Sequence, residues 1–258
     1  MCDHSRRVVL ALMAHPDDAE FLCVGALSLL ADIGWEVHIA AMTPGDCGSS
    51  SLSREAIASV RRAEGTDAAA LIGASFHCLE ECDVNVIYNE RANRKVIDLM
   101  RQISPSLVFT HPRRDYMIDH EQTHVLARNA TFAYPIPNAS TLPLPDGAKV
   151  PHLYYCDPID AVDPYSGELA VPSVYVNTTS VIDRKSAALA RHASQREWLL
   201  VHHGMDEYTE VMLRHSRQRG AEVGWDHAEA FAQHRGHAYP QSDILREELQ
   251  EFTQCPVL

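Results

Sequence analysis

The chain has 258 residues, 46% of them hydrophobic, and a formal net charge of −13 with histidine counted as neutral. This length and composition fit one large α/β domain, or one domain with a small appendage. The negative charge argues against nucleic acid and anionic membrane surfaces as main partners. No apolar run approaches the roughly 20 residues that span a bilayer. The polar residues 1–7 do not resemble a signal peptide, so a cytoplasmic location is expected.

Short apolar segments alternate with helical patterns along the chain. Strands are predicted at about 7–14, 35–42, 75–79, 107–110, 152–156 and 173–177, with a further candidate at 84–88. Helices are predicted at about 18–33, 53–72, 90–103, 120–133 and 180–201, and near 205–219 and 242–253. This alternation predicts βαβ units and a Rossmann-like, mostly parallel sheet flanked by helices. We expect one domain over 1–258, with an irregular loop region at 134–172 and a polar, helical C-terminal region at 200–258.

The seven cysteines are odd in number and form no Cys-x-x-Cys pair. Free thiols in a reducing compartment are therefore expected, rather than a disulfide framework.

The stretch Ala-His-Pro-Asp-Asp-Ala-Glu at 14–20 directly follows the first predicted strand. Open α/β folds bind their ligands at the carboxyl ends of such strands. His15 and Asp18 are three residues apart, so both can reach one ion. Asp17 stands between them and can remove a proton from metal-bound water. An ordinary helix start also favours Asp and Pro, but that explains one Asp and not the His-Pro-Asp-Asp combination.

A second polar cluster, residues 111–120, follows the predicted strand at 107–110. Parallel strands bring both clusters to one edge of the sheet, where His120 can complete a site with His15 and Asp18. Three protein ligands and an open position are typical of a catalytic metal, whereas structural zinc usually has four ligands, often cysteines. The open position would take water, whose pKa zinc lowers towards about 7. Asp17 would act as the base and then return the proton to a leaving amine.

These motifs resemble the LmbE/PIG-L-like N-acetylglucosaminyl deacetylases, which are zinc-dependent hydrolases. Other segments resemble the family in the same order: the loop at 43–48, the Arg-x-x-Glu helix starting at Arg61, Asp119-His120, the His-Ala-Ser-Gln stretch at 192–195, Arg219-Gly220 and residues 228–231. The resemblance spans nearly the whole chain, and the first motif is its most specific part.

The resemblance implies that His15, Asp18 and His120 bind Zn²⁺, or another divalent metal such as Fe²⁺. It implies that Asp17 is the general base, and it suggests a homo-oligomer. Glu20 either supports the site or places a favourable charge in the first helical turn.

Further residues are assigned by the same resemblance, each with a plainer alternative. Arg61 becomes a sugar contact, unless it is a solvated or ion-paired helix residue. His192 becomes a residue that orients Asp17 or the substrate, unless it lies on a helix surface. Asp119 orients a ligand, the base or the substrate, unless it is a helix N-cap.

One position departs from the family pattern. Relatives often have His-Pro-Asp-His at the second motif, and the first His helps to stabilise the oxyanion. Here that position is Met117, which cannot donate a hydrogen bond. Loss of one such donor typically costs about 100- to 1,000-fold in rate.

Tyr116 is the first choice for a replacement donor. Arg114, a candidate substrate contact, and His111 and His124 are also close in sequence. In the competing idea, His192 reaches across and Met117 only lines an apolar pocket.

The sequence therefore predicts a metal-dependent N-deacetylase acting on a small N-acetylglucosamine-type amino-sugar conjugate. One alternative is a related amidase acting on a non-sugar amide. Another is a metal- or sugar-binding protein in which Met117 leaves weak or no catalysis, although an intact Asp17 argues against a pure binding site. Two His and one carboxylate also occur in non-haem Fe(II) oxygenases, but those enzymes are typically β-sandwiches.

Overall fold

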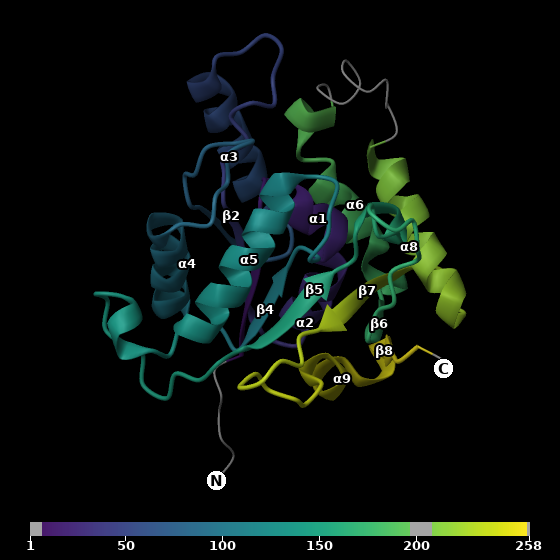
Figure 1. Cartoon of the computed structure of the whole chain (residues 1–258). Coiled ribbons are helices and arrows are strands. Elements are labelled where there is room, and N and C mark those ends of the chain that lie inside the picture. Colours follow the sequence, from purple (N-terminus) through teal and green to yellow (C-terminus); the bar gives the residue numbers. More distant parts are fainter. Residues whose placement is uncertain (1–6, 197–207, 257–258) are drawn as a thin grey trace.

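The computed structural model describes residues 7–196 and 208–256, which build one mixed β-sheet between two layers of helices (Figure 1). The strand order is β3-β2-β1-β4-β5-β7-β6-β8. The strands are β1 Val8–Met13, β2 Glu36–Ala41, β3 Ser75–Cys78, β4 Leu107–Thr110, β5 His152–Cys156, β6 Val174–Asn177, β7 Ala228–Gln233 and β8 Thr253–Gln254. The first five strands in this order pair in parallel, and the remaining pairings are antiparallel. The predicted mostly parallel, helix-flanked sheet is confirmed.

The central strand β1 is buried on both faces, which explains its continuous apolar run. Its residues 9, 11 and 13 face one core and residues 8, 10 and 12 face the other. The helices are α1 Asp18–Leu22, α2 Val24–Asp32, α3 Arg54–Ala70, α4 Glu90–Ile103, α5 Ile118–Ala133, α6 Ile182–Leu189, α8 Tyr208–Val223 and α9 Ile244–Leu249. Helices α4 and α5 cover one face of the sheet, and α1, α2, α6, α8 and α9 contribute to the core on the other.

The register of β1 and β4 positions the two polar clusters. These strands are parallel neighbours, with Leu12 paired to Thr110. The segments that follow them therefore leave the sheet at the same edge. The expectation that residues 15–20 and 111–120 converge is confirmed.

The predicted helix at 18–33 is two helices, because the backbone breaks at Cys23. The break starts a new helix N-terminus, whose Gly25 and Ala26 amides donate to the Glu229 carboxylate at 2.8 and 2.7 Å. This acceptor lies about two hundred residues away in the chain, so local sequence patterns could not reveal it.

Two other expectations were wrong. Residues 84–88 are not a strand, because the amides of Val84 and Val86 donate to the Asp119 carboxylate instead of to a neighbouring strand. The helix predicted at 180–201 ends at Leu189 as α6, and a turn separates it from helical residues 193–196. Residues 197–207 of the predicted helices lie outside the described residues.

The region after residue 200 contains more than the helices that we expected. Residues 228–233 form β7, a strand inserted between β5 and β6. Its Glu229 is 2% exposed and pairs with the Lys185 ammonium at 2.6 Å. Glu229 and Gln233 interrupt the apolar residues of this strand, and the local sequence does not reveal that Glu229 is buried against Lys185, which is why the strand was missed.

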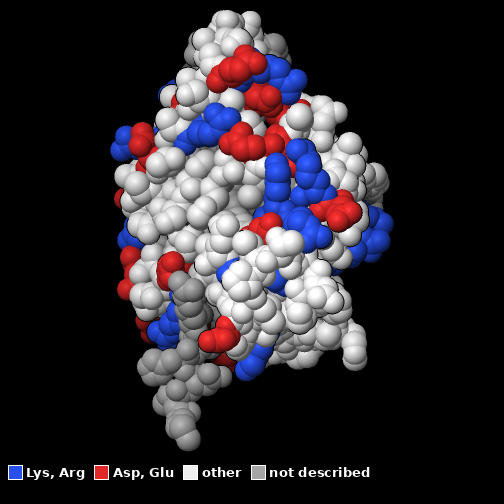
Figure 2. Space-filling model, turned by 90° about the vertical axis from the view of Figure 1, so that its left-hand side faces the viewer, with Lys and Arg blue, Asp and Glu red and all other residues white. Residues whose placement is uncertain are grey.

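The face drawn in Figure 2 has basic and acidic side chains next to one another rather than a large patch of one sign. Several charged side chains of the described residues form ion pairs, including Arg62 with Glu80 and Arg91 with Glu81, each at 2.8 Å. Among the described helices, none is both long enough and apolar enough to cross a membrane.

Candidate metal centre and active-site cavity

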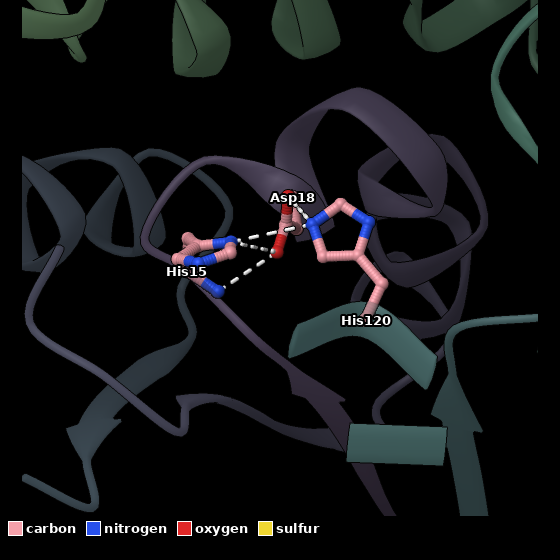
Figure 3. A group of neighbouring side chains, drawn as sticks. All are labelled: His15, Asp18 and His120. Carbon is pink, nitrogen blue, oxygen red and sulfur yellow. Dashed lines mark hydrogen bonds and ion pairs between the residues drawn. The ribbon is translucent and has the colours of Figure 1, made fainter. Parts of the chain in front are cut away.

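His15, Asp18 and His120 point towards one another at the carboxyl edge of the sheet (Figure 3). His15 Nδ1 lies 3.2 Å from His120 Nε2 and 3.4 Å from an Asp18 carboxylate oxygen. His120 Nε2 lies 3.5 Å from the other Asp18 oxygen. The three predicted metal ligands are therefore brought together by the loop after β1 and the start of α5.

The carboxylates on the outer sides of the two histidines favour a cation between them. His120 Nδ1 lies 2.8 Å from Asp115, and His15 Nε2 lies 3.1 Å from Asp83, so both carboxylates favour a proton on these nitrogens. In the neutral rings, His15 Nδ1 and His120 Nε2 then carry lone pairs that face each other at 3.2 Å. Two lone pairs cannot share a hydrogen bond, but both can bind one metal ion, and carboxylate partners of this kind commonly orient metal-binding histidines. The residues present therefore fit a divalent metal.

The charges around His15 and Asp18 also favour a bound cation. Burial alone would lower the pKa of His15, but the carboxylates of Asp119, Asp18 and Asp83 raise it well above its ordinary value. The pKa of Asp18 is held well below its usual range by His120, His111 and His15, which outweigh the effect of burial. Such a concentration of negative charge is a suitable environment for a cation.

Asp17 stands at the N-cap position of α1, but its carboxylate makes no capping hydrogen bond. Instead its Oδ2 accepts a hydrogen bond of 2.6 Å from the Tyr208 hydroxyl, and its Oδ1 lies 3.5 Å from Arg61. Its backbone has φ 107°, in a region that L-residues rarely adopt and that costs about 1–3 kcal/mol. Burial raises the pKa of Asp17, against the opposing charge of Arg61. A buried carboxylate with a raised pKa suits a general base.

Arg61 lines the cavity, yet its guanidinium is held by backbone oxygens. It donates to Pro16 O at 2.7 Å and to Gly45 O at 3.3 Å, and its side chain is nearly inaccessible. Gly45 adopts φ +69°, and a Cβ there would lie 2.0 Å from the guanidinium. Arg61 therefore fixes the loops around Asp17, and its proposed contact with a sugar stays a prediction.

Tyr116 and Met117 both line the cavity of about 610 Å³ beside the metal centre. The Tyr116 ring stands edge-on to His120, with the ring centroids 5.3 Å apart, and the residue is 64% exposed. His111 is fully buried and stacks on His120, and its Nε2 accepts from the Ala14 amide at 3.0 Å. His111 thus supports a ligand ring, whereas Tyr116 is accessible from the cavity.

Three other predicted site residues lie behind or beside the cavity lining. His192 is 1% exposed, and its Nε2 lies 3.5 Å from the buried Glu20. The charges of Glu20 and Asp17 raise the pKa of His192, although burial alone would lower it. Arg114 pairs with Asp163 at 3.1 Å on the surface.

Asp119 is not an N-cap, since Met117 holds that position. Its carboxylate binds the amides of Val84 and Val86 and lies 3.4 Å from His15 Nε2. It thus lies where a residue that orients a ligand is expected.

Residues 10–131 match the family model described as GlcNAc-PI de-N-acetylase, PIG-L. The fold is similar to that of N,N'-diacetylchitobiose deacetylase from Pyrococcus horikoshii, with a TM-score of 0.75 and 23% identity over 92% of this chain and 88% of that one. Residues 10–131 thus form a segment that matches the PIG-L family model, and the fold of the chain is similar to that of a deacetylase. This confirms the resemblance drawn from the sequence motifs.

Curated relatives of this chain differ in activity. A 4-oxalmesaconate hydratase of Pseudomonas putida is 26% identical over 229 residues, which cover 85% of this chain and 83% of the relative. A probable N-acetyl-α-D-glucosaminyl L-malate deacetylase 2 of Bacillus cereus is 28% identical over 208 residues, 75% of this chain and 86% of the relative. The matches to this chain thus include deacetylases and a hydratase.

Three residues contact the predicted site residues but were not assigned from the sequence. Asp115 and Asp83 each face one of the two histidines predicted to bind metal, and Tyr208 donates to Asp17. Asp115 lies inside the second polar cluster, between β4 and His120. Its position in the sequence could therefore have indicated that it belongs to the site. Asp83 follows no motif, and Tyr208 comes from α8, almost two hundred residues from its partner.

Proposed function

We propose that this protein is a metal-dependent N-deacetylase that hydrolyses the acetamide of a small N-acetylglucosamine-type amino-sugar conjugate. The observation that carries the proposal is the convergence of His15, Asp18 and His120 with Asp17 held beside them. The net reaction adds water to the amide and releases acetate and an amine.

Each polar residue of the centre has a distinct role in this reaction. His15 Nδ1, Asp18 and His120 Nε2 would hold a divalent cation, zinc being the first candidate and Fe²⁺ the alternative. Such a cation polarises a bound carbonyl and acidifies a bound water. Asp17 takes a proton from the attacking water and passes it to the nitrogen that leaves. Tyr208 and Arg61 keep the carboxylate oriented for both transfers.

Negative charge develops on the carbonyl oxygen, and Met117 cannot donate to it. We assign that role to Tyr116, because its ring adjoins His120 and its side chain lines the cavity. His192 is the competitor, but it is buried and does not line the cavity among the described residues. If Tyr116 is the donor, Tyr116→Phe lowers kcat and kcat/KM together in metal-loaded protein. A silent Tyr116→Phe, with this pattern in His192→Ala instead, would reassign the role to His192.

The test of the proposal is a screen of N-acetylated sugars and sugar conjugates. Free amine and acetate are quantified together with zinc and iron in the same sample. Equimolar amine and acetate from an acetylated amino sugar, at full metal occupancy, supports the proposal. Release from simple non-sugar amides alone would make the protein an amidase, and metal binding without release would make it a binding protein.

A hydratase is the second candidate, and two observations favour it. The hydratase of Pseudomonas putida is 26% identical over 85% of this chain, and Met117 replaces the usual oxyanion donor. Addition of water to a conjugated double bond also needs a base and a polarising cation. The two reactions are separable, because hydration removes the ultraviolet absorbance of a conjugated substrate and releases no acetate.

A further inference from the structure

The cavity beside the metal centre has two chemically different sides. Four carboxylates lie towards the metal centre, those of Asp17, Asp18, Asp83 and Asp115. Four other lining side chains belong to or pack against one hydrophobic cluster and form the apolar side of the cavity: Phe21 and Leu22 from α1, Ile159 after β5, and Val211 from α8. Its volume of about 610 Å³ is within the usual range for pockets that enclose a small molecule, about 300–1,000 Å³.

Among the described residues, the lining offers no uncommitted cationic side chain. Arg61 is the single Lys or Arg in it, and its guanidinium is already bound to two backbone oxygens and lies beside Asp17. Arg114 is outside the lining, where it pairs with Asp163 and lies over the Tyr165 ring. Apart from the divalent cation of the proposed centre, the described lining therefore offers a phosphate or carboxylate on the substrate only carboxylates, which is unfavourable in a partly buried site.

The apolar side begins next to the base. The Tyr208 hydroxyl that binds Asp17 belongs to a ring whose centroid lies 6.5 Å from that of Phe21, and Val211 follows on the same helix. In the proposed reaction Asp17 returns its proton to the nitrogen that leaves. The amine portion of the substrate therefore lies on this side, against Phe21 and Val211.

We propose that the substrate is uncharged and carries an alkyl or aryl group on its amine portion, which packs against Phe21, Leu22, Ile159 and Val211. This inference rests on the proposed deacetylation and adds the chemical class of the substrate. Each methylene buried on this side contributes about fourfold to affinity. The preference appears mainly in KM, because contacts remote from the amide act equally in the ground and transition states.

The test uses the metal-loaded protein and a series of N-acetylglucosaminides with methyl, butyl, hexyl and phenyl aglycones, compared with N-acetylglucosamine 1-phosphate. We expect kcat/KM to rise at least tenfold from methyl to hexyl through a falling KM, and the phosphate compound to be the poorest substrate. Equal kcat/KM across the uncharged series, or a preference for the phosphate compound, would overturn the inference.

Two variants test whether the apolar side of the cavity causes the preference for longer aglycones. Val211→Ser and, independently, Ile159→Ser are each expected to reduce the hexyl-to-methyl ratio of kcat/KM several-fold. Val171→Ser is the matched control, because Val171 is 82% exposed and lies outside the lining. An unchanged ratio in both cavity variants, with folding verified by their melting temperatures, would count against the assignment.

Binding measured by calorimetry separates the two proposals. If no compound is hydrolysed but Kd falls from the methyl to the hexyl compound, deacetylation is wrong and the apolar subsite is supported. If the compounds are hydrolysed without any dependence on the aglycone, deacetylation is supported and the apolar subsite is wrong.

Discussion

The two parts of the sheet contribute differently to the active site. The parallel part, β3-β2-β1-β4-β5, carries the loops that supply the three metal-binding candidates and the carboxylates behind them. The antiparallel part, β7-β6-β8, supplies none of these groups. Through α8, which packs against β7, it supplies Tyr208 beside the base and one apolar side of the cavity. The first part thus provides the reacting centre, and the second holds and shapes it.

The antiparallel part is stabilised by buried charges rather than by apolar packing alone. Lys185 pairs with Glu229 at 2.6 Å, and Arg219 pairs with Asp157 at 2.6 Å. Removing one member of such a pair typically costs about 3–5 kcal/mol, because the other charge stays buried. We therefore expect this part to tolerate few substitutions even though it contains no metal ligand.

The largest effect is expected from the metal ligands of the parallel part. His120→Ala removes one of three ligands, so metal occupancy should fall markedly and turnover should disappear with it. Metal content after gel filtration and acetate release are the measurements. His237→Ala is the control, since His237 is exposed and far from the centre in sequence and contacts. Full occupancy in His120→Ala would exclude this residue from the site.

Asp17→Asn tests the base separately from the metal. Asp17 adjoins the ligands but binds Tyr208 and Arg61, so the variant should keep its metal. Loss of a general base typically lowers the rate by about 100- to 10,000-fold. Near-normal turnover in a variant with a full complement of metal would place the base elsewhere.

The difference between the parallel and the antiparallel part of the sheet also explains which features the sequence could predict. Strand and helix order in the parallel part follows from local apolar runs, and the metal ligands follow two such strands directly. His15, Asp18 and His120 were therefore predicted to converge, and the structure brings them together. Tyr208 and the strand with Glu229 were missed, because their roles depend on partners far along the chain. The buried charge of Glu229 is compensated by Lys185, and a single sequence does not show that these two distant residues are paired.

Tyr208→Phe tests whether the antiparallel part positions the base. The substitution removes the hydroxyl that donates to Asp17 at 2.6 Å but keeps the ring beside Phe21. We expect kcat to fall about tenfold, the equivalent of one hydrogen bond to a charged group, with KM and metal content unchanged. A rise in KM with constant kcat would mean that Tyr208 binds the substrate instead of positioning the base.

The smallest effect concerns stability in acid, and it is tested with one buried histidine from each part of the molecule, His124 and His215. Burial lowers the pKa of His124 on α5 to about 4. Burial and the charges of Lys185 and Arg219 lower that of His215 on α8 to about 3.

Below pH 6.5 the unfolded chain binds a proton at each histidine that the folded protein does not. Each therefore costs about 1.4 kcal/mol of unfolding free energy per pH unit as the pH falls from 6.5 towards its folded-state pKa. We expect His124→Gln and His215→Gln each to flatten this dependence in urea unfolding between pH 6.5 and 4.5. In the double variant the two reductions in the pH dependence of the unfolding free energy should add, because the two sites lie in different parts of the molecule. If the slope of the parent protein survives in both single variants, carboxylate protonation and not these histidines governs its acid unfolding.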